Sequence, residues 1–320
     1  MNTTKRYYDE IDALKGLAIF FVVLGHSIIR FPLNLHDNEY CLVLFNFVSS
    51  IHMPLFFLIS GFCFSYNGDY KKFLIKKVDR LILPYIVFNL IDMIPRFLLS
   101  QYVNRSRGIL ESVKRILFNG GEYWFLYVLF IIFAIYPAIH LWQKASMLRK
   151  GIFVAVSFCL IIADINISLF RIETVIYYLF YFNLGVVLKT SSIKFFNFKK
   201  SFLSILTPIV LFLIWISLIV LPTTCFLDIL IALLGIITCY YFTQFEIFNC
   251  IFRRFGEYSL QLYLLNGFLL VISREIICRV TEVPFIIILF NMLVDFILSY
   301  VFIKYICRRI VFVRKIMGMI

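Results

Sequence analysis

Long apolar segments separated by short polar ones run through the whole sequence. Ten of them are long enough to cross a bilayer, since a spanning helix needs about 20 mostly apolar residues. Each is expected to be helical, because lipid offers no hydrogen-bond partner to an exposed backbone. The predicted spans are residues 11–30, 41–66, 80–100, 123–140, 151–168, 173–189, 202–220, 225–245, 257–273 and 284–305. The pattern predicts an all-α integral membrane protein of about ten transmembrane helices, forming one domain over residues 1–320.

Composition then excludes several classes of protein. Hydrophobic residues make up 62% of the chain and charged residues 15%, against roughly 45–50% and about 25% in soluble domains. These values exclude a soluble enzyme, a disordered chain and a secreted disulfide scaffold. The eight cysteines include no C-x-x-C pair, and the four histidines lack ligand spacing. We therefore expect neither a metal site nor a disulfide framework.

The net charge of +13 is best explained by topology rather than by a nucleic-acid partner. With the N-terminus placed inside, 21 of the 31 Lys and Arg residues fall in cytoplasmic segments and nine in outer ones. This bias predicts that both termini are cytoplasmic. Five of the nine outer charges lie in the longest loop, 96–122. Ordinary solvation and a surface for an anionic or sugar substrate are both open for that loop.

The first span carries three ionisable residues, Asp12, Lys15 and His26. Such groups are costly in lipid and are functional candidates. Lys15 and His26 are 11 residues apart, which puts both on one helix face about 16 Å apart along the axis. Asp12 precedes Lys15 by three residues and can pair with it. The alternative is a lysine that extends to the interface and a histidine that only packs.

Polar residues in later segments give further candidates. His52 lies in the second span, where it either supports chemistry or simply hydrogen-bonds a neighbouring helix. Asn266 in the ninth span fits interhelical hydrogen bonding. Asp295 places a carboxylate near the middle of the last span, which is costly unless it is buried against a partner. His36 and His140 have the character of ordinary surface residues.

Two groups lie at the predicted membrane surfaces. Lys76, Lys77 and Arg80 cluster on the cytoplasmic side, where they either bind phosphates and acidic headgroups or mark topology. Glu122 and Trp124 begin a span at the outer face, and Trp124 also fits an interfacial aromatic belt.

Five short motifs, taken in order and spacing, resemble the acyltransferase-three family of bacterial membrane acyltransferases. Lys77 stands where that family usually has Arg, which would weaken a bidentate phosphate contact. Asn266 stands where the family often has His. The motifs are D-A-L-K-G-L-A from Asp12 followed by Gly25-His26, H-M-P-L-F-F-L-I-S-G from His52, K-V-D-R from Lys77, W-F-L from Trp124, and G-E-Y-S-L-Q-L-Y-L-L-N from Gly256.

The resemblance implies transfer of an acetyl or other short acyl group from cytoplasmic acyl-CoA, here acetyl-CoA, to a hydroxyl of a surface polysaccharide or its lipid-linked precursor. His26 would be the general base, because neutral imidazole suits that task near pH 7; a covalent acyl-imidazole is the second mechanism. Asp12 would orient Lys15, and His52 would support by hydrogen bonding.

The remaining candidates would bind substrates. Lys76, Lys77 and Arg80 would meet acyl-CoA, and Glu122, Trp124 and Asn266 would meet the acceptor. The location would be the bacterial inner membrane, in contact with lipid; the oligomeric state stays open. The alternative function is a transporter or flippase for a polysaccharide or lipid-linked sugar.

Overall fold

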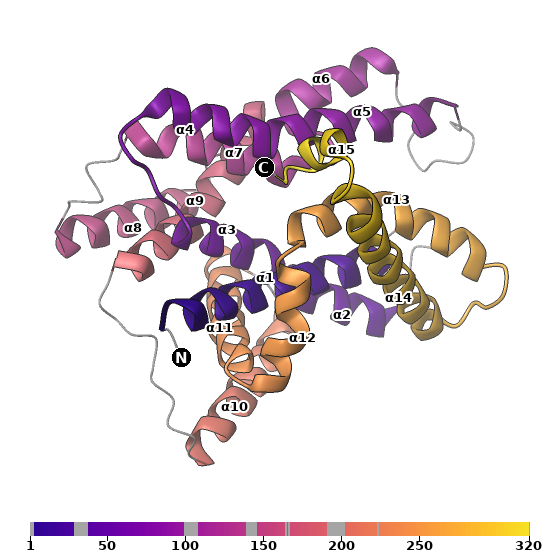
Figure 1. The fold of residues 1–320 in the computed structure, drawn as a ribbon. Coiled ribbons are helices and arrows are strands. Elements are labelled where there is room, and N and C mark those ends of the chain that lie inside the picture. Colours follow the sequence, from indigo (N-terminus) through magenta and orange to yellow (C-terminus); the bar gives the residue numbers. More distant parts are fainter. Residues whose placement is uncertain are drawn as a thin grey trace. The chain divides into compact units, whose positions relative to one another are not determined.

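The computed structural model describes residues 3–28, 38–98, 108–138, 146–163, 165, 167–190, 202–222 and 224–319. Over these residues every regular element is a helix, and no strand is formed (Figure 1). The elements are α1 (Thr3–Ile28), α2 (Glu39–Ser49), α3 (His52–Phe62), α4 (Tyr70–Lys77), η2 (Val78–Ile82), α5 (Leu83–Leu98), α6 (Ile109–Asn119), α7 (Trp124–Ile135), α8 (Met147–Ile162), η5 (Leu169–Arg171), α9 (Ile172–Thr190), α10 (Phe202–Ile219), α11 (Cys225–Thr243), α12 (Glu246–Gly256), α13 (Ser259–Ile277), α14 (Pro284–Phe302), η6 (Ile303–Cys307) and α15 (Val311–Ile316).

Seven helical segments of the described chain are long and apolar enough to cross a membrane, which supports an all-α integral membrane protein. Three predicted spans correspond instead to the shorter α5 and α8, of 16 residues each, and to α10, whose described apolar part is Leu206–Ile219. The number of about ten spans stays a prediction. The seven segments are Asp9–Ile28, Glu39–Phe62, Ile109–Ala138, Leu169–Thr190, Cys225–Thr243, Ser259–Ile277 and Pro284–Cys307.

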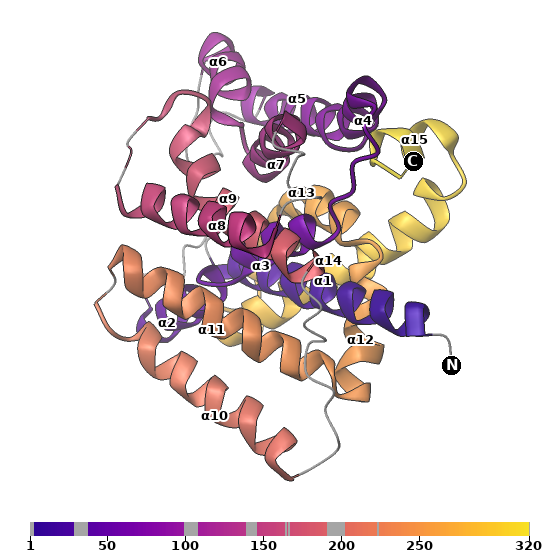
Figure 2. The ribbon, with the colours of Figure 1, turned by 90° about the vertical axis from the view of Figure 1, so that its left-hand side faces the viewer.

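The chain forms two compact units, which are described in turn. Unit 1 comprises Met1–Cys63 and Leu184–Phe296, and unit 2 comprises Phe64–Asn183 and Ile297–Ile320. In unit 1, α1 is the central helix and contacts α2, α3, α11, α12 and α13. Figure 2 shows α10 and α11 side by side within this unit.

The second predicted span is divided into α2 and α3 by a break at Ser50–Ile51. Pro54 explains the position of the break. It lies in the first turn of α3, where its missing N–H costs no intrahelical hydrogen bond. A proline deeper in a continuous helix would have removed one. The sequence predicted one span here, and the structure starts a new helix at His52.

In unit 1, α1 and α12 touch backbone to backbone, and two glycines make this possible. A Cβ on Gly16 would lie 1.8 Å from the carbonyl oxygen of Phe252, and one on Gly256 would lie 1.6 Å from that of Asp12. The same two helices are joined by an ion pair between Arg253 and Asp9, with Nη1 and Oδ2 2.9 Å apart. Two glycines from separate sequence motifs thus allow α1 to pack closely against α12.

Unit 2 is organised around aromatic rings. Phe64 contacts Phe133, Tyr136 and Phe182, with ring centroids 6.2, 4.9 and 5.8 Å away. These contacts pack α7 and α9 against the segment that begins at Phe64. The segment before α5 is a π-helix, η2, a form often found at functional positions.

The outer loop predicted over 96–122 contains a helix, α6, which packs beside α5 (Figure 1). The prediction of a plain loop was therefore wrong. The helix is amphipathic: Leu110, Val113 and Leu117 are exposed on one side, and Glu111 and Arg115 lie on the other. Three- and four-residue spacing of apolar positions is the signature of a surface helix.

We expect Gly256→Ala to lower the stability of the protein strongly. The new methyl group would meet the Asp12 carbonyl, so α1 and α12 would have to separate. Overpacking of this kind costs about 1–3 kcal/mol or more. The thermal unfolding midpoint of the purified protein in detergent measures it.

Gly151→Ala is the matched control. Gly151 lies inside α8 with open space around it, and alanine is the better helix former. Its midpoint should equal or exceed that of the wild type. A Gly256→Ala protein as stable as the wild type would contradict the close packing of α1 on α12.

Candidate active site

The first-span residues lie on one continuous helix, as predicted. Lys15 and His26 are both in α1, which runs unbroken from Thr3 to Ile28. Lys15 Nζ donates to Asp12 Oδ1 over 2.9 Å, which confirms the predicted pair. Both side chains keep more than a quarter of their surface exposed. The pair is therefore accessible to a ligand and contributes little to stability by itself.

His26 is bonded to Asn266, 240 residues later in the chain. His26 Nδ1 and Asn266 Oδ1 are 2.5 Å apart. On its other side, Asn266 Nδ2 donates to Asp295 Oδ2 over 3.3 Å. Asn266 is 1% exposed and Asp295 is fully buried. Helices α1, α13 and α14 thus supply one chain of polar contacts, all within unit 1.

With Asp295 ionised, this chain of contacts determines which nitrogen of His26 carries the proton. A carboxylate only accepts hydrogen bonds, so the amide group of Asn266 faces Asp295 and its oxygen faces His26. That oxygen also only accepts, so Nδ1 of His26 is the donor. In a neutral imidazole the other nitrogen, Nε2, then holds the lone pair. The arrangement prepares Nε2 to act as a base or a nucleophile.

Arg274 secures the backbone at the same place. It is fully buried in α13, and its Nη2 donates to the carbonyl oxygens of His26 and Ser27. These carbonyls lie in the last turn of α1, where intrahelical partners run out. A cation also interacts favourably with a helix C-terminus. The ninth predicted span ended at residue 273, just before Arg274, whereas α13 continues to Ile277 and includes Arg274.

His52 forms a local hydrogen bond to the backbone four residues earlier. Its Nδ1 lies 2.6 Å from the carbonyl oxygen of Val48, across the break between α2 and α3. A carbonyl only accepts, so Nδ1 donates and Nε2 is the unprotonated nitrogen of the neutral ring. The ring therefore satisfies a carbonyl near the end of α2. A supporting part in the chemistry stays a prediction.

The basic segment of unit 2 divides into two environments. Lys76 and Arg80 are exposed. Lys77 instead directs its ammonium onto the ring of Phe133, 3.6 Å from the centroid, with Phe73 at 5.3 Å. A cation over an aromatic face is held there electrostatically. Of the three, Lys76 and Arg80 are thus the side chains presented to solvent.

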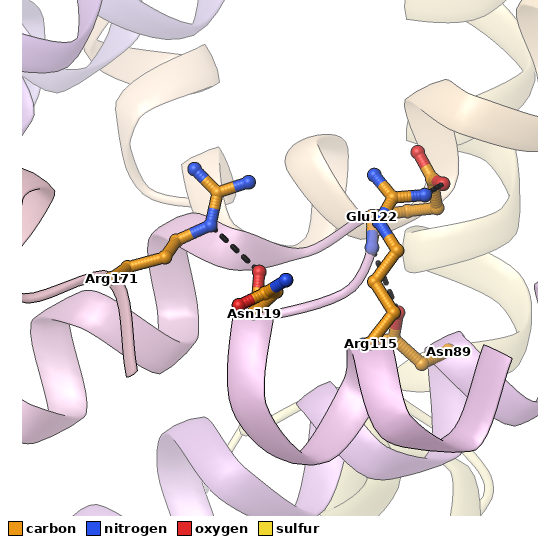
Figure 3. A network of polar contacts seen from close by, with 5 residues as sticks. All are labelled: Asn89, Arg115, Asn119, Glu122 and Arg171. Carbon is orange, nitrogen blue, oxygen red and sulfur yellow. Dashed lines mark hydrogen bonds and ion pairs between the residues drawn. The ribbon is translucent and has the colours of Figure 1, made fainter. Parts of the chain in front are cut away.

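Glu122 lies in a turn that Asn89 organises (Figure 3). The Glu122 backbone N–H donates to Asn89 Oδ1 over 3.0 Å. Its carboxylate pairs with Arg115, with Oε1 and Nη1 2.6 Å apart. Gly121 has φ +54°, and a Cβ there would lie 2.1 Å from Asn89 Oδ1. The two consecutive glycines Gly120 and Gly121 are therefore required by the left-handed backbone and by this close approach.

Arg171 completes this region of unit 2. Its Nε donates to the carbonyl oxygen of Asn119 over 2.7 Å (Figure 3). The guanidinium lies 5.4 Å from the ring centroid of Trp124, which in turn stacks on Tyr178 at 5.7 Å. Phe170 and Arg171 have φ of 55° and 52°. Strained non-glycine backbone of this kind costs about 1–3 kcal/mol per residue and gathers at functional sites.

A shallow groove lies on the polar side of α6. Its volume is about 290 Å³, and Glu111, Lys114, Arg115, Phe118 and Asn119 line it. It is open to solvent and smaller than most small-molecule sites, which span about 300–1,000 Å³. Residues three and four apart on a helix share a face, so the groove follows directly from the sequence of α6.

The structure joins some predicted residues and adds others that the sequence did not identify. Asp12 meets Lys15, and His26 meets Asn266. The structure adds four residues to the predicted site residues: Asn89, Arg115, Arg171 and Arg274. It also shows that Asp295, predicted only as a buried carboxylate that needs a partner, bonds to Asn266. A signal existed only for Asp295, a charge in the middle of a span. Among the described residues no cluster of His, Cys, Asp and Glu could hold a metal ion.

Comparison with known proteins identifies the family of the chain. A family model described as "Acyltransferase domain" matches residues 8–304, which extend across both units. Nodulation protein NolL of Sinorhizobium fredii (strain NBRC 101917 / NGR234) is 27% identical over 151 residues, or 45% of this chain and 40% of NolL. The chain thus matches less than half the length of that relative. No solved structure matches.

A model that covers nearly the whole chain is decisive for the family. It implies an acyl donor and an acceptor, and the membrane-length helices imply a bilayer around them. This multi-pass membrane protein belongs to the acyltransferase family that its sequence motifs resemble.

Proposed function

We propose that this acyltransferase moves an acetyl group from cytoplasmic acetyl-CoA to a hydroxyl of a surface polysaccharide or its lipid-linked precursor, in the bacterial inner membrane, with both termini cytoplasmic. The observation that carries the proposal is the 2.5 Å contact between His26 Nδ1 and Asn266 Oδ1. It leaves the lone pair on Nε2, and a sugar hydroxyl needs such a base before it can attack a thioester.

The reaction then proceeds in one displacement. His26 Nε2 removes the hydroxyl proton as the sugar oxygen forms a bond to the thioester carbonyl carbon. The carbon–sulfur bond breaks, and the thiolate takes the proton back from the imidazolium to give free CoA. The second mechanism has Nε2 attack the thioester first and form an acyl-imidazole. The product is the same in both.

Lys76 and Arg80 are proposed to receive the phosphates of acetyl-CoA. Both are exposed, whereas Lys77 is engaged with Phe133. The proposal therefore reduces the predicted phosphate-binding residues from three to two. Lys77 positions the segment, and Lys76 and Arg80 bind the phosphates. The π-helical turn at Val78–Ile82 presents Arg80 beside the end of α4.

The acceptor is proposed to bind at Glu122, Trp124 and the groove of α6. Glu111 and Glu122 offset Lys114 and Arg115 there, and Arg171, over the ring of Trp124, adds one further cation. A mixed polar surface with the aromatic rings of Phe118 and Trp124 suits the hydroxyl groups of a sugar.

The first test replaces His26. His26→Ala should lower acetyl transfer by about 100- to 10,000-fold, the usual contribution of a general base. Purified protein in detergent is incubated with radiolabelled acetyl-CoA and bacterial polysaccharide and lipid-linked saccharide fractions, and label in the glycan is counted. His36→Ala, in the predicted outer loop, is the control. Near-normal transfer by folded His26→Ala would reject His26 as the reactive base. Glycan movement without thioester loss would favour the transporter.

The second test concerns the donor. Lys76→Ala/Arg80→Ala should raise KM for acetyl-CoA by about tenfold, since each lost charge-assisted hydrogen bond is worth about 1.5–3 kcal/mol at most and exposure reduces it. The effect should shrink with acetyl-dephospho-CoA, which lacks one phosphate. Lys72→Ala, also exposed on α4, is the control. An unchanged KM in the double variant would remove the segment from the donor site.

The third test concerns the acceptor. Glu122→Gln should raise KM for the glycan and leave KM for acetyl-CoA unchanged. The Glu122 side chain is 35% exposed, so its ion pair adds at most about 1 kcal/mol to stability. A kinetic effect without a fall in the unfolding midpoint would thus report binding. Arg115→Lys tests the same pair from its other side, and wild-type kinetics in both variants would exclude it.

A further inference from the structure

Asp295 is a carboxylate buried completely in α14, near the middle of a predicted span. Removing a charge from water is expensive unless it is paired or hydrogen-bonded. Charged groups inside membrane spans are therefore rare and functional by default. Its Oδ2 accepts a hydrogen bond from the amide nitrogen of Asn266, 3.3 Å away. That amide contacts in turn the ring that the proposed function makes reactive.

We propose that Asp295 is a positioning residue for acyl transfer: through Asn266 it holds His26 in the tautomer with the proton on Nδ1. This inference rests on the proposed function for its catalytic meaning, but its structural content stands by itself. An isolated asparagine can turn its amide over, which would place an N–H beside His26. The carboxylate of Asp295 makes only one orientation favourable, because it accepts from nitrogen and not from oxygen.

The tautomer decides reactivity. Free imidazole in water favours the proton on Nε2, which would leave Nε2 without a lone pair for the sugar hydroxyl. In the arrangement seen here the proton stays on Nδ1 throughout. When Nε2 gains the hydroxyl proton, the positive ring is stabilised by the aligned amide dipole and the carboxylate beyond it. No proton crosses the amide, so Asp295 acts through its charge and its hydrogen bond alone.

A second polar pair on the same helices gives a matched comparison. Asn291 lies one turn before Asp295 in α14 and is also fully buried. Its Oδ1 accepts from Ser273 Oγ over 2.8 Å, and Ser273 Oγ also reaches the carbonyl oxygen of Leu270 at 3.2 Å. Leucine at 291 keeps the side-chain volume and leaves Ser273 an acceptor. Asn291→Leu therefore removes a buried polar group without touching the contact to His26.

The first experiment reads the tautomer directly. The whole protein is labelled with ¹⁵N-histidine, purified in detergent, and studied by NMR at about pH 8; a His26→Gln sample assigns the His26 signals. We expect the Nδ1–H form in the wild type and in Asn291→Leu. We expect a shift toward the Nε2–H form in Asp295→Asn and Asn266→Leu. An Nε2–H wild type, or an unchanged signal in Asp295→Asn, would overturn the proposal.

The second experiment is kinetic, with radiolabelled acetyl-CoA and the glycan fractions described above. Asp295→Asn should lower kcat by about 10- to 100-fold, the range for groups that orient a reactive ligand, with both KM values unchanged. Asn266→His should keep most of the activity and Asn266→Leu should not, since imidazole, like an amide, can accept at one atom and donate from another. Wild-type kcat in Asp295→Asn, or an equal loss in Asn291→Leu, would reject the positioning role.

The two proposals fail in different ways. An active His26→Ala protein would reject the proposed function while the tautomer measurement still stood. A wild-type ring with its proton on Nε2 would reject the part given to Asp295 and leave His26→Ala inactive. Unfolding midpoints of all variants separate both results from loss of the fold.

Discussion

The buried carboxylate of Asp295 is the constraint around which unit 1 is arranged. A charge inside a span must find hydrogen-bond donors in the protein, because lipid offers none. Asn266 supplies one, and its oxygen then has to be satisfied by His26. Arg274 adds a second buried charge and bonds the last carbonyls of α1. The side chain of His26 is thus held through the Asn266 amide, and its backbone is held directly by Arg274, so both are fixed by other helices, as a reactive group requires.

The sequence could predict what is local. Apolar length predicted helices, and three-residue spacing predicted the pair of Asp12 and Lys15. The contact between His26 and Asn266 joins residues 240 positions apart, and spacing along a chain says nothing about which helices meet. The D-A-L-K-G-L-A and G-E-Y-S motifs each contain a glycine at this helix crossing. Gly16 and Gly256 are the residues where α1 and α12 touch. Small residues at helix crossings are the usual device in membranes.

Unit 2 shows where pattern reading fails for a different reason. The outer segment was charged enough to be taken for a loop, although Leu110, Val113 and Leu117 already had helical spacing. In such a segment the high charge content suggests a loop and the periodicity of apolar residues suggests a helix. The periodicity is the better guide to secondary structure. Arg171 gave no signal, because its left-handed backbone is imposed by tertiary contacts rather than by its residue type. The sequence could not distinguish Lys77 from the other basic residues of its segment, because its contact with the Phe133 ring depends on the tertiary fold.

Asparagine at position 266 also limits how the reaction proceeds. An amide neither gains nor loses a proton in the physiological range, unlike the histidine that the resemblance of the motif leads one to expect there. Under the proposed function, the proton taken from the sugar hydroxyl therefore stays on Nε2 of His26 until the thiolate removes it. One atom serves as base and then as acid, so the hydroxyl oxygen and the leaving sulfur must both come within hydrogen-bond distance of Nε2. Under the proposed function, direct transfer would require the thioester and the acceptor hydroxyl both to reach Nε2 of His26.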